Sequence, residues 1–276
     1  MTETIKNLTI NTSAPELDAG LLNLKQKVVE SFTLDLSEVV WLKPIDVVRF
    51  KCAHRLAREM NCLTSIKAPK QTDVARYARR MGLFDIALGT SADPQATFFP
   101  LYPVADDNNS ALFDELIRVF GPEEPSVNWA GEVAGALTEL VDNIYYHSGV
   151  TPNSGWGYAH AQKLPNANTI SVGIADVGVG YTASYRRTGQ DKGRSPLQIV
   201  QDSFKLQESS LNVPGKPPHR GIGLSHVMDF ISGFNGTLKL FTDNVSAELQ
   251  GKGSLQVQDA GYDVCGTWIS LEVPIV

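Results

Sequence analysis

The chain has 276 residues, of which 42% are hydrophobic and 20% charged, a balance typical of folded globular proteins rather than of disordered chains. Its 30 acidic and 24 basic residues give a formal net charge of -6, which argues against sequence-independent binding to nucleic acid. No apolar run approaches the roughly 20 residues that cross a membrane, and the N-terminus does not resemble a secretory signal, so we expect a cytoplasmic protein that makes no membrane contact.

Strands alternate with helices in the first part of the chain. Apolar and polar residues alternate in the strand segments, and the helical segments carry apolar residues three and four positions apart. In chain order, we expect strand 31–39, helix 44–60, strand 62–68 and helix 71–84. This alternation predicts a small, mainly parallel sheet in an α/β domain over residues 1–90.

A polar segment separates this part from the rest. Residues 89–110 are rich in Pro, Asp, Asn and Ser and show little periodicity. We therefore expect a linker or a packed connector over residues 91–108. The aromatic residues Phe98, Phe99 and Tyr102 favour a connector that packs against the protein over a freely flexible linker.

The remaining residues, 109–276, mix helices and strands in a different order. We expect helices 111–121 and 126–146, strands 156–164 and 169–176 joined by a turn, a long polar loop 183–218, helix 221–234, and strands 237–242, 246–250 and 267–275. Helices covering one face of a mixed, mostly antiparallel sheet would satisfy this order. The fold class predicted for the whole chain is therefore α+β.

The helix at 126–146 carries a polar column beside its apolar face. Glu139, Asn143 and His147 are four residues apart, so they lie one turn above another. An amide oxygen is a hard ligand that suits Mg²⁺, and a carboxylate one turn away could deprotonate a nucleophile. Taken alone, this column is better explained as a solvated helix face.

Two glycine-containing motifs follow. Asp176 ends an apolar strand and is followed by Gly178 and Gly180, where the backbone could approach a ligand closely and the carboxylate could accept a hydrogen bond from an adenine amino group. The second motif opens a helix and consists of Arg220, Gly221, Ile222, Gly223 and Leu224. Its free amides and its arginine suit phosphate, although each motif alone is weak.

The order of these motifs resembles a known family. An acid/amide helix, Asp-x-Gly-x-Gly, a polar loop, Gly-x-Gly-Leu and a final Gly-Thr at Thr267 also follow one another in the ATP-binding domain shared by gyrase, the heat-shock chaperones of the same fold, histidine kinases and MutL, known as GHKL. The resemblance covers about 111–276. The helix motif is most similar to that of anti-sigma-factor serine kinases, and the Gly-x-Gly-Leu segment to that of histidine kinases.

The resemblance implies a Bergerat-type α/β sandwich that binds ATP and Mg²⁺. Asn143 would be the Mg²⁺ ligand, with His147 one turn beyond it, and Glu139 the catalytic general base or water-orienting acid. Asp176, with Gly178 and Gly180 beside it, would bind the adenine amino group, and Thr267 would lie near the base. Arg220, Gly221, Ile222, Gly223 and Leu224 would form the phosphate-binding motif. The stretch 183–218 would be the lid over the triphosphate.

The first part of the chain has a weaker resemblance to a STAS domain, the anti-sigma-factor antagonist fold. In that fold a phosphorylatable Ser or Thr begins a helix after a strand, whereas residues 41–48 here read "WLKPIDVV". The implied domain would then serve for docking. A generic small α/β domain is an equal alternative.

Three functions follow from these resemblances. The first is a Ser/Thr protein kinase or switch ATPase that acts on a protein partner. The second is a nucleotide-gated interaction module with little turnover. The third is an orphan histidine kinase, for which His54 is the candidate phosphoacceptor, although its surroundings lack the usual acceptor motif. Homodimerisation is implied by the family resemblance alone.

Overall fold

The computed structural model describes residues 4–10, 13–84, 98–104, 129–148, 157–164, 167–205 and 223–275. These residues form an α+β structure with two sheets, which is the fold class that the sequence predicted. One sheet has three parallel strands in the order β1-β2-β3, and the other has seven strands in the order β4-β5-β6-β10-β7-β8-β9. We call residues 4–84 the N-terminal unit and residues 98–275 the C-terminal unit.

The N-terminal unit is a regular β-α repeat. Its elements are β1 (Thr4–Ile10), α1 (Ala14–Gln26), β2 (Val28–Asp35), α2 (Pro44–Glu59), β3 (Leu63–Lys67) and α3 (Thr72–Arg80). Both strand pairings are parallel, as the alternation of elements predicted. Sequence analysis recovered four of these elements and missed β1 and α1.

The C-terminal unit is built on an antiparallel sheet. Its strands are β4 (Phe98–Val104), β5 (Gly157–Leu164), β6 (Thr169–Asp176), β7 (Thr237–Thr242), β8 (Val245–Gln250), β9 (Gln256–Asp259) and β10 (Thr267–Pro274). Its described helices are α5 (Trp129–His147), α6 (Gly180–Arg187), α7 (Pro196–Ser203) and α8 (Gly223–Gly233). Every strand pairing is antiparallel, and the last strand, β10, lies between β6 and β7. The ends of β6 and β10 are therefore adjacent.

Part of the predicted linker or connector belongs to this sheet. Strand β4 pairs with β5 at the sheet edge, with Tyr102 opposite Ala159 and a register shift between Phe99 and Tyr102. The other residues of that segment lie outside the described residues. The helix predicted at 111–121 also lies outside them.

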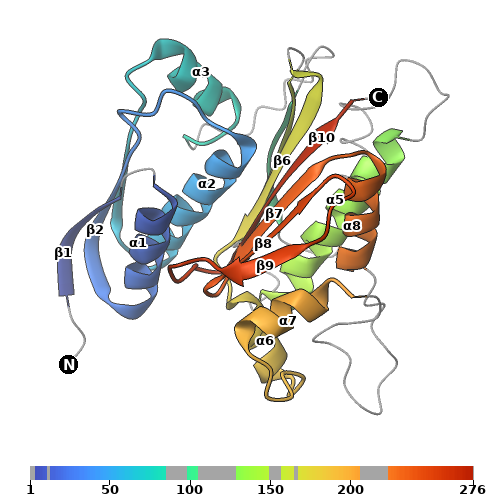
Figure 1. Ribbon diagram of the computed structural model, residues 1–276. Helices are drawn as coiled ribbons and strands as arrows, with labels where there is room; N and C mark the ends of the chain where they lie inside the picture. The colour runs from blue at the N-terminus through green and yellow to red at the C-terminus, as the bar shows by residue number, and fades with distance from the viewer. Residues whose placement is uncertain are drawn as a thin grey trace.

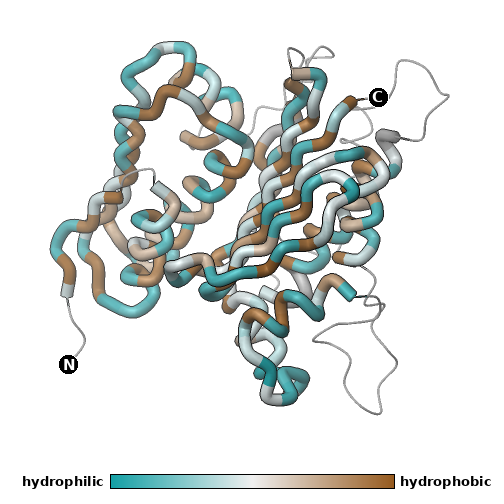
Figure 2. The backbone as a smooth tube through the Cα atoms, viewed as in Figure 1, coloured by the Kyte–Doolittle hydropathy of each residue, from teal (hydrophilic) through white to brown (hydrophobic). Residues whose placement is uncertain are grey.

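Four layers are stacked in the order sheet, helices, sheet, helices (Figure 1). Helices α5 and α8 cover one face of the large sheet, and α2 covers the other. The sequence predicted helices on one face only, so the second covered face is a correction. Apolar and polar residues alternate along much of this sheet (Figure 2), but every residue of β6 after its first is buried, as expected for a strand covered on both faces.

Helix α2 links the two units because it packs on both sheets. Most of its residues are buried, including Val47, Phe50 and Leu56. Its first turn approaches β6 so closely that a side chain at Gly173 would lie 2.4 Å from the backbone nitrogen of Ile45. Gly173 therefore makes room for α2 in the middle of a strand.

The prediction of a long polar loop over residues 183–218 is wrong for the first part of that stretch. Residues 183–187 of that stretch belong to α6, and residues 196–203 form α7. The part from residue 206 lies outside the described residues. Helix α7 begins with a capping box, in which Ser195 and Gln198 exchange hydrogen bonds. Each helix has only 8 residues and a polar composition, so neither produced a clear apolar period. Within the described part of the chain, none of the helices is long and apolar enough to cross a membrane.

Candidate functional site

A small cavity lies where α5, β6, α6 and β10 meet. Its volume is about 20 Å³, room for about one water molecule. The residues that line it are Leu140, Asn143, Ile144, Ser148, Asp176, Gly180, Tyr181, Thr267 and Ile269. Four of them, Asn143, Asp176, Gly180 and Thr267, were selected from three separate sequence motifs. The fold thus brings residues that are up to 124 positions apart to one place.

Asp176 is a buried acid at the end of β6, where it pairs with Thr267 of β10. Its Oδ1 accepts a hydrogen bond from the backbone N–H of Gly178 at 2.6 Å. Burial raises the pKa of the carboxyl to about 6, against the lowering effects of that hydrogen bond and of the positive charge on Lys25. A carboxyl held in this way, beside a cavity, is typical of a functional site.

The loop after Asp176 packs tightly beneath the end of α5. The backbone N–H of Val179 donates to the carbonyl oxygen of Ser148 at 2.8 Å. A side chain at Gly178 would lie 2.3 Å from the same oxygen, so only glycine fits. The sequence predicted this glycine as a point of approach for a ligand, and the structure shows that the protein's own backbone requires it.

Asn143 brings an unsatisfied polar group to the cavity. It is half-buried on α5, and its Nδ2 is buried without a hydrogen-bond partner among the described residues. A buried, unpaired amide costs about 1–3 kcal/mol, and such atoms in a folded protein call for an explanation. A polar ligand in the cavity would supply the missing partner.

Thr267 belongs to a short network of hydroxyl groups. Its Oγ1 lies 3.1 Å from Oγ1 of Thr242 on β7, which also donates to the carbonyl oxygen of Gly266 and accepts from the backbone N–H of Tyr181 at 3.2 Å. Since Thr242 has one hydroxyl hydrogen, used on Gly266, Thr267 is the donor between the two hydroxyls. This network joins the starts of α6 and β10.

Asp243 fixes the start of α6 from the turn between β7 and β8. Its Oδ2 accepts from the backbone N–H and the hydroxyl of Thr182, at 2.9 and 2.8 Å. Sequence analysis missed both Thr242 and Asp243, because nothing in "LFTDNV" distinguishes this turn from any other tight turn between strands.

Helix α1 of the N-terminal unit supports the site from behind. Nζ of Lys25 donates to the carbonyl oxygen of Gly178 at 2.7 Å. Oδ1 of Asp18 accepts from the backbone N–H of Cys265, two positions before Thr267, at 3.3 Å. Asp18 also forms a buried ion pair with Arg49, with Oδ2 and Nη2 2.7 Å apart. Both loops that present cavity residues are therefore held by one helix.

These supporting residues left little signal in the sequence. Lys25 and Gly178 are 153 positions apart, and Asp18 and Cys265 are 247 apart. The one available hint is that α1 contains a charged residue, Asp18, on its apolar face, where it is fully buried. A buried charge of this kind requires a partner elsewhere in the fold.

The other predicted site residues lie away from the cavity or outside the described residues. Glu139 is half-buried on α5, one turn before Asn143, and does not line the cavity. Leu224 is buried in the core beneath the large sheet, and Gly223 is the first residue of α8. His147 ends α5, but its side chain, like Arg220, Gly221 and Ile222, lies outside the described residues.

Comparison with known proteins adds no assignment to this geometry: no protein-family model and no curated protein sequence matches the chain. In the part of the chain that the structure describes, no group of three or more His, Cys, Asp or Glu side chains could hold a metal ion.

Proposed function

We propose that the chain binds ATP together with Mg²⁺ in a site of the GHKL type, centred on the cavity between α5, β6, α6 and β10. The observation that carries this proposal is the convergence of Asn143, Asp176 and Thr267, predicted from three separate motifs, around one cavity. The all-antiparallel sheet with α5 and α8 on one face is compatible with a Bergerat-type arrangement.

The donors and acceptors around the cavity fit an adenine ring. Asp176 would accept a hydrogen bond from the exocyclic amino group. Oγ1 of Thr267, whose hydrogen is used on Thr242, would accept a hydrogen bond from a water that bridges to the ring. The cavity holds only about one water as it stands. Entry of the base therefore requires lining side chains, such as Tyr181, to move aside.

The remaining residues would act on the phosphate side. Asn143 would offer its amide oxygen to Mg²⁺, and Gly221 and Gly223, at the start of α8, would offer backbone amides to the phosphates. Glu139, one turn before Asn143, would take the hydroxyl proton of a partner side chain or of a water molecule. Bound Mg-ATP supplies the phosphoryl group and the charge neutralisation that this transfer needs.

We infer that the biological role is that of a regulatory Ser/Thr protein kinase or switch ATPase acting on a protein partner, with the N-terminal unit as a STAS-like docking module. A nucleotide-gated interaction module without turnover is the second candidate. The tight contacts of α1 with both cavity loops favour it, because they couple the N-terminal unit to the nucleotide. The histidine-kinase alternative is disfavoured, since His54 is 8% exposed on a helix packed between two sheets.

Nucleotide selectivity tests the proposal. The carboxylate of Asp176 would accept from the amino group of adenine but would repel the carbonyl oxygen of guanine. We expect ATP to bind at least about fivefold more tightly than GTP, since an unpaired buried acceptor costs at least about 1 kcal/mol. Equal binding of ATP and GTP in equilibrium dialysis would refute the assignment of Asp176.

Labelled ATP then separates the candidate roles. Transfer of the γ-phosphoryl group to a hydroxyl of a partner protein would establish a kinase, and release of phosphate without transfer a switch ATPase. Tight binding with neither outcome would establish the interaction module. Acid-labile label on the chain itself would instead support the histidine kinase.

A further inference from the structure

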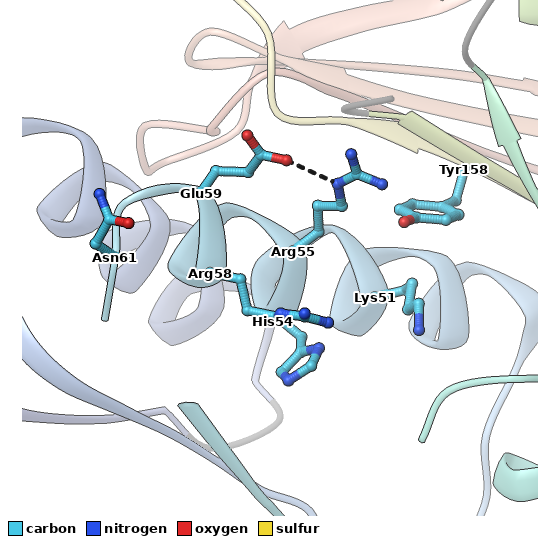
Figure 3. A pocket seen from close by; sticks show the side chains of 7 residues that line it. All are labelled: Lys51, His54, Arg55, Arg58, Glu59, Asn61 and Tyr158. Atoms are coloured by element: carbon cyan, nitrogen blue, oxygen red, sulfur yellow. Dashed lines mark hydrogen bonds and ion pairs between the residues drawn. The ribbon is translucent and has the colours of Figure 1, made fainter. Parts of the chain in front are cut away.

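Helix α3, at the top of the N-terminal unit in Figure 1, is fixed by contacts from both units. Ala78 on its inner side is fully buried, and the hydroxyl of Tyr77 donates to Oε1 of Gln162 on β5 at 2.6 Å. Just after the helix, the carbonyl oxygen of Gly82 accepts from Nζ of Lys51 at 3.1 Å. Lys51 comes from α2, where it also lines a pocket between α2 and β5 (Figure 3). These contacts hold one side of the short helix and leave its other side to solvent.

The outer side of α3 carries three arginines. Arg76, Arg79 and Arg80 are all exposed, and their spacing of three and four residues from Arg76 makes them neighbours on one side of the helix. We call these three residues the arginine face of α3. The one acid of the helix, Asp73, pairs with Arg76, with Oδ1 and Nη1 3.0 Å apart and both side chains well exposed. Such a pair contributes little in water, so a carboxylate of a partner could replace it.

Basic residues outnumber acids on the elements around this face. Helix α3 and the strands it contacts, β4 and β5, together contain four basic residues and one acid. The two lysines just before α3 are each paired with a carboxylate. Among the described residues, neither Arg79 nor Arg80 forms an ion pair, and Arg80 lies over the ring of Phe98 on β4, 5.1 Å from its centroid. The positive charges of Arg79 and Arg80 are therefore available to a partner.

The use of arginine at all three positions favours a binding surface over a solvated helix face. The helix dipole favours basic residues in a last turn, and Arg186 and Arg187 hold the same place in α6. That effect requires only a positive charge, which lysine also supplies. A guanidinium adds a planar fork that binds both oxygens of a carboxylate, and arginine is enriched at protein interfaces where lysine is depleted.

We propose that the arginine face of α3 docks an acidic segment of a partner protein. The three arginines span roughly 6 Å along the helix axis, which suits a few carboxylates of a short peptide. The net charge of -6 on the chain opposes nucleic acid as the partner. Because both units already hold the helix, docking would order little that is not ordered before. The inference rests on the proposed docking role of the N-terminal unit and requires no bound nucleotide.

Fluorescence anisotropy of labelled hexaglutamate with the full chain, in low salt and without nucleotide, tests the proposal. Binding should be saturable, about threefold weaker in Arg79→Gln and about tenfold weaker when Arg80→Gln is added, since each change removes one exposed charge pair. Arg79→Lys with Arg80→Lys should give an intermediate affinity, because lysine keeps the charge but not the fork. The matched control is Arg187→Gln, at an exposed position in the last turn of α6, which should bind like the unmodified chain.

Three outcomes would overturn the proposal. The first is no saturable binding of hexaglutamate. The second is equal weakening by Arg187→Gln and Arg79→Gln, which would indicate a general effect of charge. The third is tighter binding of a single-stranded oligonucleotide of equal charge that Arg79→Gln abolishes, which would make a phosphate backbone the partner. Asp176→Asn should bind the peptide normally, so failure of the proposed nucleotide site and failure of this surface are distinguishable.

Discussion

Asp176 combines several properties that rarely occur together in a residue with a purely structural role. It is buried, its pKa is raised to about 6 by that burial, and it borders a cavity beside the amide nitrogen of Asn143, which has no hydrogen-bond partner among the described residues. A carboxyl this far from its ordinary pKa of 3.8 destabilises the folded protein at neutral pH. A ligand that donates a hydrogen bond to it would recover part of this cost.

The pH dependence of stability should report this carboxyl. Because its folded pKa lies above its unfolded pKa, the folded chain holds a proton between about pH 4 and 6 that the unfolded chain has lost, and stability falls as pH rises through that window. Asp176→Asn cannot ionise. Its stability relative to the unmodified chain should therefore increase by up to roughly 3 kcal/mol between pH 4 and 7, as followed by urea unfolding. A difference independent of pH would contradict the assignment.

Glu139 and Asn143 should differ in what they affect. Glu139 does not line the cavity, so Glu139→Ala should leave ATP affinity within about twofold and lower turnover by about a hundredfold or more, the usual contribution of a general base. Parallel binding and phosphate-release assays would measure both. Loss of affinity together with turnover would show that Glu139 binds the nucleotide instead.

For individual residues, the sequence predicted those that carry chemical motifs and missed those that support them. Asn143, Asp176 and Thr267 stand in patterns of neighbouring residues that a reader of the sequence can recognise. Thr242 acts through its hydroxyl contacts with Tyr181, Gly266 and Thr267, and Lys25 through one hydrogen bond to Gly178. All these partners are distant in the sequence, so no local pattern records the contacts. Whether Arg220 reaches a phosphate stays a prediction.

Among the elements, α1 has a role that its composition did not reveal. It presents Lys25 to the loop after β6 and Asp18 to the loop before β10, so it fixes the relative position of the two loops. Helix α1 and strand β1 were both missed, whereas the longer α2 and α5 were predicted within a few residues. The missed elements β1, α6 and α7 are short or mostly exposed, but β3 and α3 are also short and were predicted, whereas α1, with 13 residues, was missed.

Lys25→Met should weaken nucleotide binding without unfolding the chain. The change removes the hydrogen bond to Gly178 and the positive charge that favours ionised Asp176. We expect the ATP dissociation constant to rise about fivefold, with Lys25→Arg restoring most of the affinity. Equal affinity in Lys25→Met would show that α1 only supports the fold. The melting temperature, recorded in parallel, separates a local effect from unfolding.

The close contact between α2 and β6 should be sensitive to a single methyl group. Gly173→Ala would place a carbon 2.4 Å from backbone of α2 that cannot move aside without shifting the helix, so we expect a loss of about 1–3 kcal/mol. Gly135→Ala, on α5, is the matched control. The added methyl there meets nothing within 4 Å, and helix propensity predicts a gain of up to about 1 kcal/mol. Equal effects in chemical denaturation would contradict this packing.

Over the whole molecule, the N-terminal and C-terminal units share one of the two hydrophobic cores. That core contains Phe32 and Leu56 of the N-terminal unit together with Tyr158, Ala175 and Cys265 of the C-terminal unit. The sequence predicted much of the secondary structure of both units, without β1, α1, α6 and α7, but not their association. The association depends on Gly173 and on apolar residues on the outer face of the sheet, which local patterns assign only to a generic strand.

The shared core predicts a single unfolding transition. Removing the N-terminal unit would expose the outer apolar face of the large sheet, so neither unit should remain folded alone. Calorimetric unfolding should show one transition whose calorimetric and van't Hoff enthalpies agree. Two resolved transitions would mean that the units fold independently and that α2 contributes little to the large sheet.

Binding of Mg-ATP by the unmodified chain and by Asn143→Ala, measured by titration calorimetry, tests the central claim most directly. Thr138→Ala, on the same helix but outside the cavity lining, is the control. We predict saturable binding by the unmodified chain and by Thr138→Ala, and at least tenfold weaker binding by Asn143→Ala. Normal binding of Mg-ATP by Asn143→Ala, or no binding by the unmodified chain, would contradict the account.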